Sequence, residues 1–251
     1  MVEEIRSYVV RATRMSDHQK DAYHRLYDRF CLPVPALGPT PAPVELPRIE
    51  WKETFPHRAE ASSDEPERPI ILDIGFGMGY ELAELADAWR HTDFLGVEVH
   101  KPGVGKLLSE IERRSLDNVR IARYDAVAVC RRMIPPATLA GIHLFFPDPW
   151  PKKRHHKRRL VRPGFPELVT PLLRRDGGYL YLVTDWENYA HWMREVLDAS
   201  PLLLNRYGGG EGDDGFAPPQ PWRPRTAFER KGLRKGHRIF ELLYHRVSEP
   251  A

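Results

Sequence analysis

The sequence predicts an α/β protein with a mostly parallel sheet that helices cover on both faces. Between residues 70 and 199, five short apolar segments alternate with stretches of helical periodicity. The first apolar segment ends in a glycine-rich turn, which is how a βαβ unit commonly opens. A chain of 251 residues with 41% hydrophobic content is long enough to bury one sizeable core. These three observations favour a single α/β domain with additions at its ends.

Each element follows from its local pattern. The segment 70–74 is a nearly continuous apolar run, typical of a buried strand, and the helical stretch 80–89 follows its glycine turn. The segment 101–115 repeats its apolar residues every three or four positions, as an amphipathic helix does. A last strand-like stretch, 239–244, is expected to pair at the sheet edge. The same reasoning predicts strands at 70–74, 94–99, 119–123, 141–146 and 179–184, and helices at 80–89, 101–115, 126–133, 163–174 and 187–199.

Two irregular segments lie outside this alternation. Residues 33–47 hold six prolines within fifteen positions, which excludes a helix or a central strand. We therefore expect residues 1–50 to form a basic, proline-rich arm, with a helical stretch at 16–30, and residues 51–251 to form the main domain. Within that domain, 205–224 combines three consecutive glycines with four prolines, so we expect a flexible loop there.

Composition restricts the classes of function. The 38 basic residues nearly balance the 35 acidic ones, so binding of a polyanion must depend on local clusters of charge. The charged start of the chain and the lack of any apolar run near 18 residues predict a soluble, cytoplasmic protein without a membrane segment. The two cysteines, Cys31 and Cys130, have no neighbouring cysteine or histidine pair, so we expect neither a disulfide framework nor a metal site.

The glycine-rich turn predicts a cofactor site. Gly75, Gly77 and Gly79 would let the backbone approach a ligand closely, but Tyr80 holds the place where a dinucleotide fingerprint needs glycine or alanine. Asp73, in the strand just before the turn, would repel a pyrophosphate and favour a cation. This pattern suits S-adenosylmethionine, whose amino acid end carries an ammonium group beside a sulfonium.

Two further carboxylates follow the next strands. Glu98 ends the second strand nineteen residues after Gly79 (98 − 79), close to the spacing at which an acidic residue accepts hydrogen bonds from ribose hydroxyls. Asp125 ends the third strand, where it could receive the adenine amino group. Each acid alone could be a helix cap or a solvated loop residue, but three at successive strand ends indicate one cofactor site.

The fourth strand ends in the most distinctive motif of the chain. Asp148 lies between two prolines in Pro147-Asp148-Pro149-Trp150-Pro151, and six cations follow within the eight residues 152–159. Open α/β sheets bind ligands at the carboxyl ends of their strands, and a phosphate backbone needs clustered cations. We therefore expect chemistry on a nucleic acid here, with Lys152, Arg154, Lys157, Arg158 and Arg159 contacting it.

Through these residues the chain resembles the class I S-adenosylmethionine-dependent methyltransferases, and more narrowly the bacterial tRNA (guanine-N7)-methyltransferases. The resemblance covers about residues 48–246. It implies a Rossmann-like, mostly parallel seven-stranded sheet with helices on both faces and an antiparallel edge strand. The motifs that carry it are 72–79, 94–100, 145–152, 157–159, Thr184-Asp185-Trp186-Glu187 and the stretch from Arg225 to His237.

The resemblance also implies roles for residues. Asp73, Glu98, Asp125 and Asp148 would line the cofactor site. The substrate, a guanosine at position 46 in the variable loop of tRNA, would meet Lys152, Asp185, Thr226, Phe228 and Glu229. The chain departs from the family at Asp73, where relatives often have glutamate, and at Arg11-Ala12-Thr13-Arg14, which lacks an expected glycine. We expect a monomer or a weak homodimer.

The chemistry of guanine N7 shapes the expected role of Asp148. N7 carries a lone pair and no proton, so methyl transfer needs alignment and support for positive charge rather than a strong base. Asp148 is the expected catalytic residue, contacting the base, the cofactor or both. The alternatives are methylation of an exocyclic amine, a small-molecule methyltransferase, and an RNA-binding protein without activity.

Overall fold

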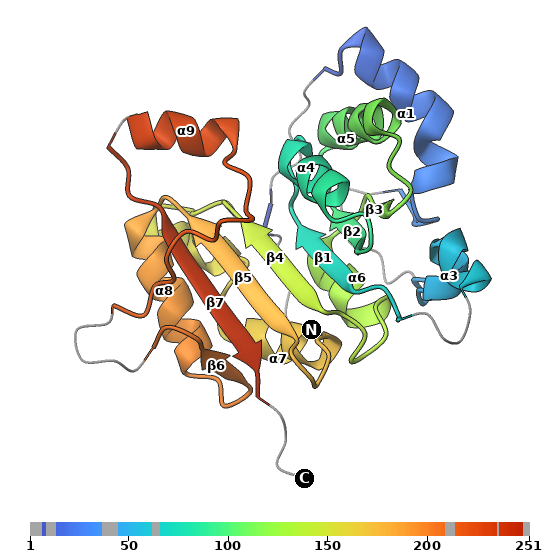
Figure 1. Ribbon diagram of the computed structural model, residues 1–251. Coiled ribbons are helices and arrows are strands. Elements are labelled where there is room, and N and C mark those ends of the chain that lie inside the picture. The colour runs from blue at the N-terminus through green and yellow to red at the C-terminus, as the bar shows by residue number, and fades with distance from the viewer. Residues whose placement is uncertain are drawn as a thin grey trace.

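The computed structural model describes residues 7–8, 14–36, 45–61, 66–208, 214–234 and 236–247. Within these ranges, seven strands form one sheet in the order β3-β2-β1-β4-β5-β7-β6 (Figure 1). The strands are β1 (Ile70–Ile74), β2 (Asp93–Val97), β3 (Val119–Ala122), β4 (Gly141–Phe145), β5 (Tyr179–Thr184), β6 (Leu203–Asn205) and β7 (Phe240–Arg246).

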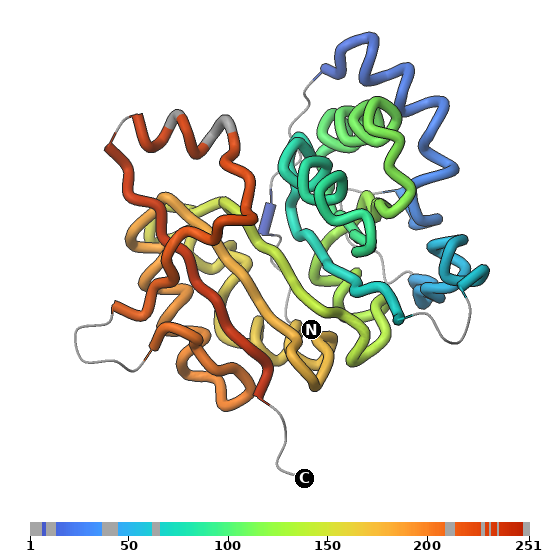
Figure 2. Tube along the Cα trace, in the orientation of Figure 1, coloured from blue at the N-terminus to red at the C-terminus, as the bar shows by residue number. Residues whose placement is uncertain are grey.

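Strand pairing confirms the predicted fold class. The ladders that join β3, β2, β1, β4 and β5 are all parallel. The last long strand, β7, runs antiparallel to β5, and the three-residue β6 pairs with its outer side. Figure 2 shows this C-terminal strand, in red, lying beside the orange β5. The result is the mostly parallel, seven-stranded sheet with antiparallel pairing at one side that the resemblance implied.

Helices cover both faces of this sheet, because neighbouring residues of each strand point to opposite sides. Ile71 packs into a core with α4 (Tyr80–Ala88) and α5 (Lys101–Arg114), whereas Leu72 packs into the core that α6 (Ala126–Arg132) and α8 (Glu187–Asp198) cover. The other helices are α1 (Asp17–Phe30), α2 (Trp51–Thr54), α3 (Pro56–Glu60), α7 (Phe165–Val169), α9 (Ala227–Arg234) and the 3₁₀ helices η1 (Lys153–Arg158) and η2 (Thr170–Leu172).

The expected helix at 163–174 is shorter than predicted. Helix α7 begins after Gly164, which adopts a left-handed conformation, and gives way to the 3₁₀ helix η2 at Thr170. Pro171 lies in this second part, and a proline supplies no amide donor for the hydrogen bond that would continue an α-helix. The α-helix is therefore expected to end near this proline.

The predicted arm is described only in part. Helix α1 begins at a capping box formed by Ser16 and Gln19 and packs along α5, where Arg25 forms a bidentate ion pair with Glu112 at 2.6 and 2.9 Å. Residues 1–6, 9–13 and 37–44 lie outside the described part, as do 209–213 of the predicted flexible loop. The described remainder of that loop is 205–208 and 214–224, and it contains the buried Phe216 and Arg223. Among the described residues, no helix has both the length and the apolar character needed to cross a bilayer.

Candidate active site

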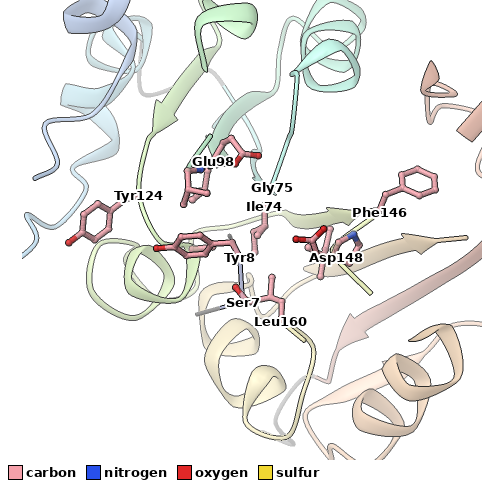
Figure 3. Close-up of a pocket in the computed structure, with 14 residues that line it drawn as sticks. Ser7, Tyr8, Ile74, Gly75, Glu98, Tyr124, Phe146, Asp148 and Leu160 are labelled. Atoms are coloured by element: carbon pink, nitrogen blue, oxygen red, sulfur yellow. Dashed lines mark hydrogen bonds between the residues drawn. The ribbon is translucent and has the colours of Figure 1, made fainter. Parts of the chain in front are cut away.

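A pocket of about 200 Å³ opens at the carboxyl ends of β1, β2 and β4. Its walls combine apolar side chains from these strands with the carboxylates of Glu98 and Asp148. Figure 3 shows the ring of Tyr8 near the middle of this pocket, with Glu98, Tyr124 and Asp148 around it. The lining residues are Ser7, Tyr8, Ile74, Gly75, Val97, Glu98, Val99, Tyr124, Ala126, Leu144, Phe146, Pro147, Asp148 and Leu160.

The glycine turn needs its glycines for two different reasons. Gly75, Gly77 and Gly79 all have positive φ angles, of 73°, 58° and 72°, which residues with a β-carbon rarely adopt. A β-carbon at Gly75 or Gly77 would meet open space, so a ligand has room to approach the backbone there. At Gly79 it would lie 2.7 Å from the β-carbon of Leu107, so this third glycine lets α4 pack on α5.

Glu98 is held by the backbone around it. Its Oε2 accepts the amide N–H of Gly77 at 2.9 Å, and its Oε1 accepts those of Val99 and His100 at 2.7 and 2.9 Å. Burial raises the pKa of the carboxyl, while these three amides and His100 act in the opposite direction. A carboxylate has about four acceptor sites, so Glu98 can still accept a hydrogen bond from a ligand in the pocket.

The other two predicted cofactor acids have distinct surroundings. Asp73 is buried in β1, and the burial, together with the charge of Glu98, raises its pKa to about 7. Asp125 is the N-cap of α6, and its Oδ1 accepts the amide N–H of Ala128 at 2.8 Å. Tyr124 and Ala126, on either side of Asp125, line the pocket. The structure thus brings the three strand-end acids to one edge of the sheet.

The loop that carries Asp148 has an unusual backbone. Phe146 and Trp150, two residues on either side of Asp148, have positive φ angles of 50° and 45°. Bulky residues rarely adopt this conformation unless their surroundings hold them in it, and such strain gathers at functional sites. Trp150 donates from Nε1 to the carbonyl of Ser7 at 3.1 Å, and Arg159 donates from Nε to the carbonyl of Pro149 at 2.9 Å. These contacts fix Asp148 at the pocket wall.

The predicted basic run separates into two kinds of cation. Lys152, Arg154 and Lys157 are exposed on or beside the short 3₁₀ helix η1, and Arg158 lies over the ring of Trp150 at 5.1 Å. Arg159 is only 1% exposed and donates to Asn188 Oδ1 at 2.7 Å as well as to Pro149. Arg159 therefore supports the loop from inside, and the surface available to a polyanion is formed by the others.

The predicted substrate residues near α9 also fall into two groups. The Oδ2 atom of Asp185, at the end of β5, lies 3.3 Å from Nδ1 of His237. Thr226 accepts the amide N–H of Glu229 at 2.9 Å and so caps the start of α9. Phe228 belongs to α9, but its side chain lies outside the described part of the structure. The side chain of Asp185 therefore lies at the carboxyl end of β5, whereas the side chain of Thr226 caps the N-terminus of α9.

Glu229 takes part in a buried ion cluster that the sequence did not predict. Arg223 donates to both carboxylate oxygens of Glu229, at 2.6 and 2.8 Å, and to Glu241 Oε1 at 2.7 Å. Tyr181 donates to the other oxygen of Glu241, and Glu81 lies 3.7 Å from Arg223. Because both oxygens of Glu229 are engaged, this residue holds α9 in place in the structure.

Two other contributors were also missed by the sequence analysis. Ser7 and Tyr8 line the pocket although they precede the first predicted element by many residues. The only available signal was the interleaving of tyrosines and arginines near the start of the chain, which does not indicate where the segment folds. Among the described residues, no group of three histidine, cysteine, aspartate or glutamate side chains is arranged to hold a metal ion.

Comparison with known proteins bears on this site. A family model described as a putative methyltransferase matches residues 67–242. The tRNA (guanine-N(7)-)-methyltransferase of Paraburkholderia xenovorans is 45% identical over 96% of this chain and 83% of its own length. The enzyme of the same name from Alkalilimnicola ehrlichii is 46% identical over 98% of this chain and 94% of its own. The crystal structure of TrmN from Thermus thermophilus, 15% identical, shares the fold with a TM-score of 0.50 over 74% of this chain and 46% of that one.

Proposed function

The chain belongs to the bacterial tRNA (guanine-N7)-methyltransferase family, and on this premise we propose that it methylates N7 of guanosine 46 in the variable loop of tRNA. The methyl donor is S-adenosylmethionine and the product is 7-methylguanosine. The observation that carries the proposal is the placement of Asp148: it lies on the pocket wall, and the loop that holds it leads directly into exposed cations. Because the substrate is tRNA, we place the enzyme in the cytoplasm.

The residues present fit the cofactor. Glu98 faces the pocket with remaining acceptor capacity, as a ribose hydroxyl requires, and Gly75 and Gly77 leave space beside the backbone. Asp73 is buried with a raised pKa, so a cation nearby would stabilise its ionised form. S-adenosylmethionine supplies the electrophilic methyl group when bound. Glu98 and Asp73 would hold its ribose and its amino acid end, and Tyr124 and Ala126 would contact the adenine.

The proposed reaction at N7 needs no general base. N7 loses no proton when it is methylated, so the protein must orient the purine and stabilise the positive charge that develops on it. Asp148 is an acceptor-only group when ionised, and it can accept the N1–H and N2–H₂ donors of guanine or support the purine electrostatically. Its rigid loop keeps the carboxylate in one place during the transfer.

The tRNA would reach the pocket along the exposed cations. Lys152, Arg154 and Lys157 project from the segment that follows the Asp148 loop, so phosphates bound there lie close to the pocket mouth. Binding of this kind is largely electrostatic and releases counterions. Asp185 lies at the end of β5, two places from β1 in the sheet, and is the next candidate for contact with the guanine edge.

The decisive experiment is methylation of an unmodified tRNA transcript with labelled S-adenosylmethionine, followed by nucleoside analysis. We expect the label in 7-methylguanosine, and we expect reduction and aniline treatment to cleave the strand at position 46. A transcript with adenosine at position 46 is the matched control and should accept little label. Label in N6-methyladenosine or in a methylated exocyclic amine of guanine would contradict the proposal and favour the rival chemistry.

A further inference from the structure

Glu81 is a buried carboxylate without a hydrogen bond to one of its oxygens. It lies in the first turn of α4, two residues after Gly79, and its side chain is 10% exposed. Within the described structure, its Oε1 has no hydrogen-bond partner. The ion pair with Arg223 is 3.7 Å long, which is beyond hydrogen-bonding distance. A buried carboxylate oxygen left in this way is costly and therefore needs an explanation.

Arg223 does not supply the missing partner. Its Nη1 and Nη2 atoms are engaged by Glu229 and Glu241 at 2.6 to 2.8 Å. The charged groups that face Glu81 are Asp73 from β1, Arg223 from the segment before α9, and Glu229 from α9 itself. The single guanidinium of Arg223 thus forms ion pairs with three glutamates, Glu81, Glu229 and Glu241. The carboxyl groups of this cluster therefore outnumber its cations.

Glu81 also continues the row of acids that begins in the pocket. The charge of Glu98 raises the pKa of Asp73, and the charge of Asp73 raises the pKa of Glu81, which reaches about 9 chiefly because the group is buried. Asp73 in β1 is therefore within electrostatic range both of Glu98, which lines the pocket, and of Glu81 in the first turn of α4. A ligand whose ribose meets Glu98 would extend its other end along this row.

We propose that Glu81, together with Asp73, binds the ammonium group at the amino acid end of the cofactor. The proposal rests on the proposed function, because it takes S-adenosylmethionine as the ligand. The aspartate side chain at position 73 is short, and Glu81 provides a second carboxylate from the helix that starts beside it. An ammonium group carries three donors and one positive charge, so it would supply the hydrogen bond that the 3.7 Å ion pair with Arg223 does not give Glu81.

Binding of the cofactor should then release a proton. Glu81 holds its proton at pH 7 in the unliganded enzyme, because its pKa is about 9. The cofactor's ammonium group favours the ionised carboxylate, so the pKa falls and the proton leaves as the ligand binds. A purely structural Glu81, bound only to the cluster around Arg223, would add nothing to the fraction of a proton that Asp73, with a pKa of about 7, releases.

The test is calorimetry at pH 7 with the Glu81→Gln variant, in buffers of different ionisation enthalpy. The ligands are S-adenosylmethionine and 5′-methylthioadenosine, which keeps the nucleoside and lacks the amino acid end. Because a hydrogen bond to a charged group is removed, we expect roughly tenfold or more weaker binding of S-adenosylmethionine. We also expect the loss of about one released proton. Binding of 5′-methylthioadenosine should be unchanged, which also shows that the variant pocket is intact.

The matched control is Glu84→Gln, which removes an exposed carboxylate from the same helix and should change neither quantity. Equal affinity and equal proton release in the wild type and in Glu81→Gln would overturn the inference. So would an equal loss of affinity for both ligands, which would assign Glu81 a structural role. A well-folded wild-type protein that binds neither ligand would instead overturn the proposed function itself.

Discussion

Two regions beside the pocket, which we call the cofactor side and the substrate side after their proposed ligands, differ in how their charged groups are placed. On the cofactor side, Asp73 is buried and Glu98 is half-buried, and three backbone amides hold Glu98 in place. On the substrate side, Lys152, Arg154 and Lys157 stand exposed along or beside a 3₁₀ helix. Buried charges need hydrogen-bond or ion-pair partners within the fold, whereas exposed cations are solvated by water until a ligand binds.

This difference in exposure fits the two ligands that we propose, a small cofactor and a tRNA. A small molecule gains most from a rigid, desolvated site, because little freedom remains to be lost when it binds. A polyanion gains affinity from counterion release, which needs accessible cations more than exact geometry. We therefore expect substitutions on the cofactor side to change cofactor affinity alone, and substitutions on the substrate side to change tRNA affinity and its dependence on salt.

The largest effect is expected at Asp148, where the two sides meet. Replacing Asp148 with alanine removes the carboxylate that orients the guanine and supports its developing charge. We expect kcat for tRNA methylation to fall by about 10²–10³, with smaller changes in the affinity for either ligand. Single-turnover kinetics with saturating cofactor and tRNA measure this directly. Asp148→Asn, which keeps the shape and loses the charge, separates orientation from electrostatic support; full activity of the alanine variant would remove Asp148 from the mechanism.

The next largest effect is expected from a substitution on the cofactor side, which should weaken cofactor binding alone. In the wild type, both carboxylate oxygens of Glu98 accept backbone N–H groups. In Glu98→Gln, an NH₂ group replaces one of these oxygens and faces a backbone donor, and the side chain becomes a weaker acceptor for the ribose. We expect binding of S-adenosylmethionine to weaken by roughly 10- to 100-fold. Calorimetry with the cofactor and filter binding with tRNA make the comparison. A parallel loss of tRNA affinity would show that the two sides are coupled rather than independent.

How far the sequence predicted this site depends on the distance over which each signal acts. The strands and the glycine turn were predictable because apolar runs and glycines act locally, and Gly75, Gly77 and Gly79 do form a turn, with positive φ angles. The cluster around Arg223 was not, because Glu81 lies 142 residues away (223 − 81) and no local pattern joins the two. Ser7, which accepts a hydrogen bond from Trp150, was missed for the same reason.

Charge runs illustrate a second limit. The sequence shows eight residues with six cations but does not say which of them face water. Arg159 lies inward over the rings of Tyr189 and Trp192, at 4.8 and 5.7 Å, because its guanidinium finds acceptors in Pro149 and Asn188. The aromatic residues that make this possible come from α8, so tertiary packing separates Arg159 from the other cations.

A smaller effect is expected from substitutions on the substrate side, which should weaken tRNA binding alone. Replacing Lys152, Arg154 and Lys157 together with alanine should weaken tRNA binding by about tenfold at moderate salt and leave cofactor binding unchanged. The slope of log affinity against log salt should become shallower by about 0.7–0.9 for each phosphate that the variant no longer neutralises. Lys52→Ala, an exposed cation of α2, is the control for general charge. An unchanged slope in the triple variant would mean that the tRNA does not lie on this surface.

The smallest effect concerns Tyr8, which stands between the two sides. The pocket measures about 200 Å³ with Tyr8 in its wall, whereas sites for ligands of drug-like size commonly measure about 300–1,000 Å³. Tyr8→Ala should enlarge the pocket and tighten S-adenosylmethionine binding by a few-fold, because the phenol no longer has to move before the cofactor enters. Tyr8→Phe keeps the ring and should resemble the wild type. Weaker binding by the alanine variant would make Tyr8 a wall of the cofactor site, and the N-terminal segment would then belong to the rigid side of the comparison.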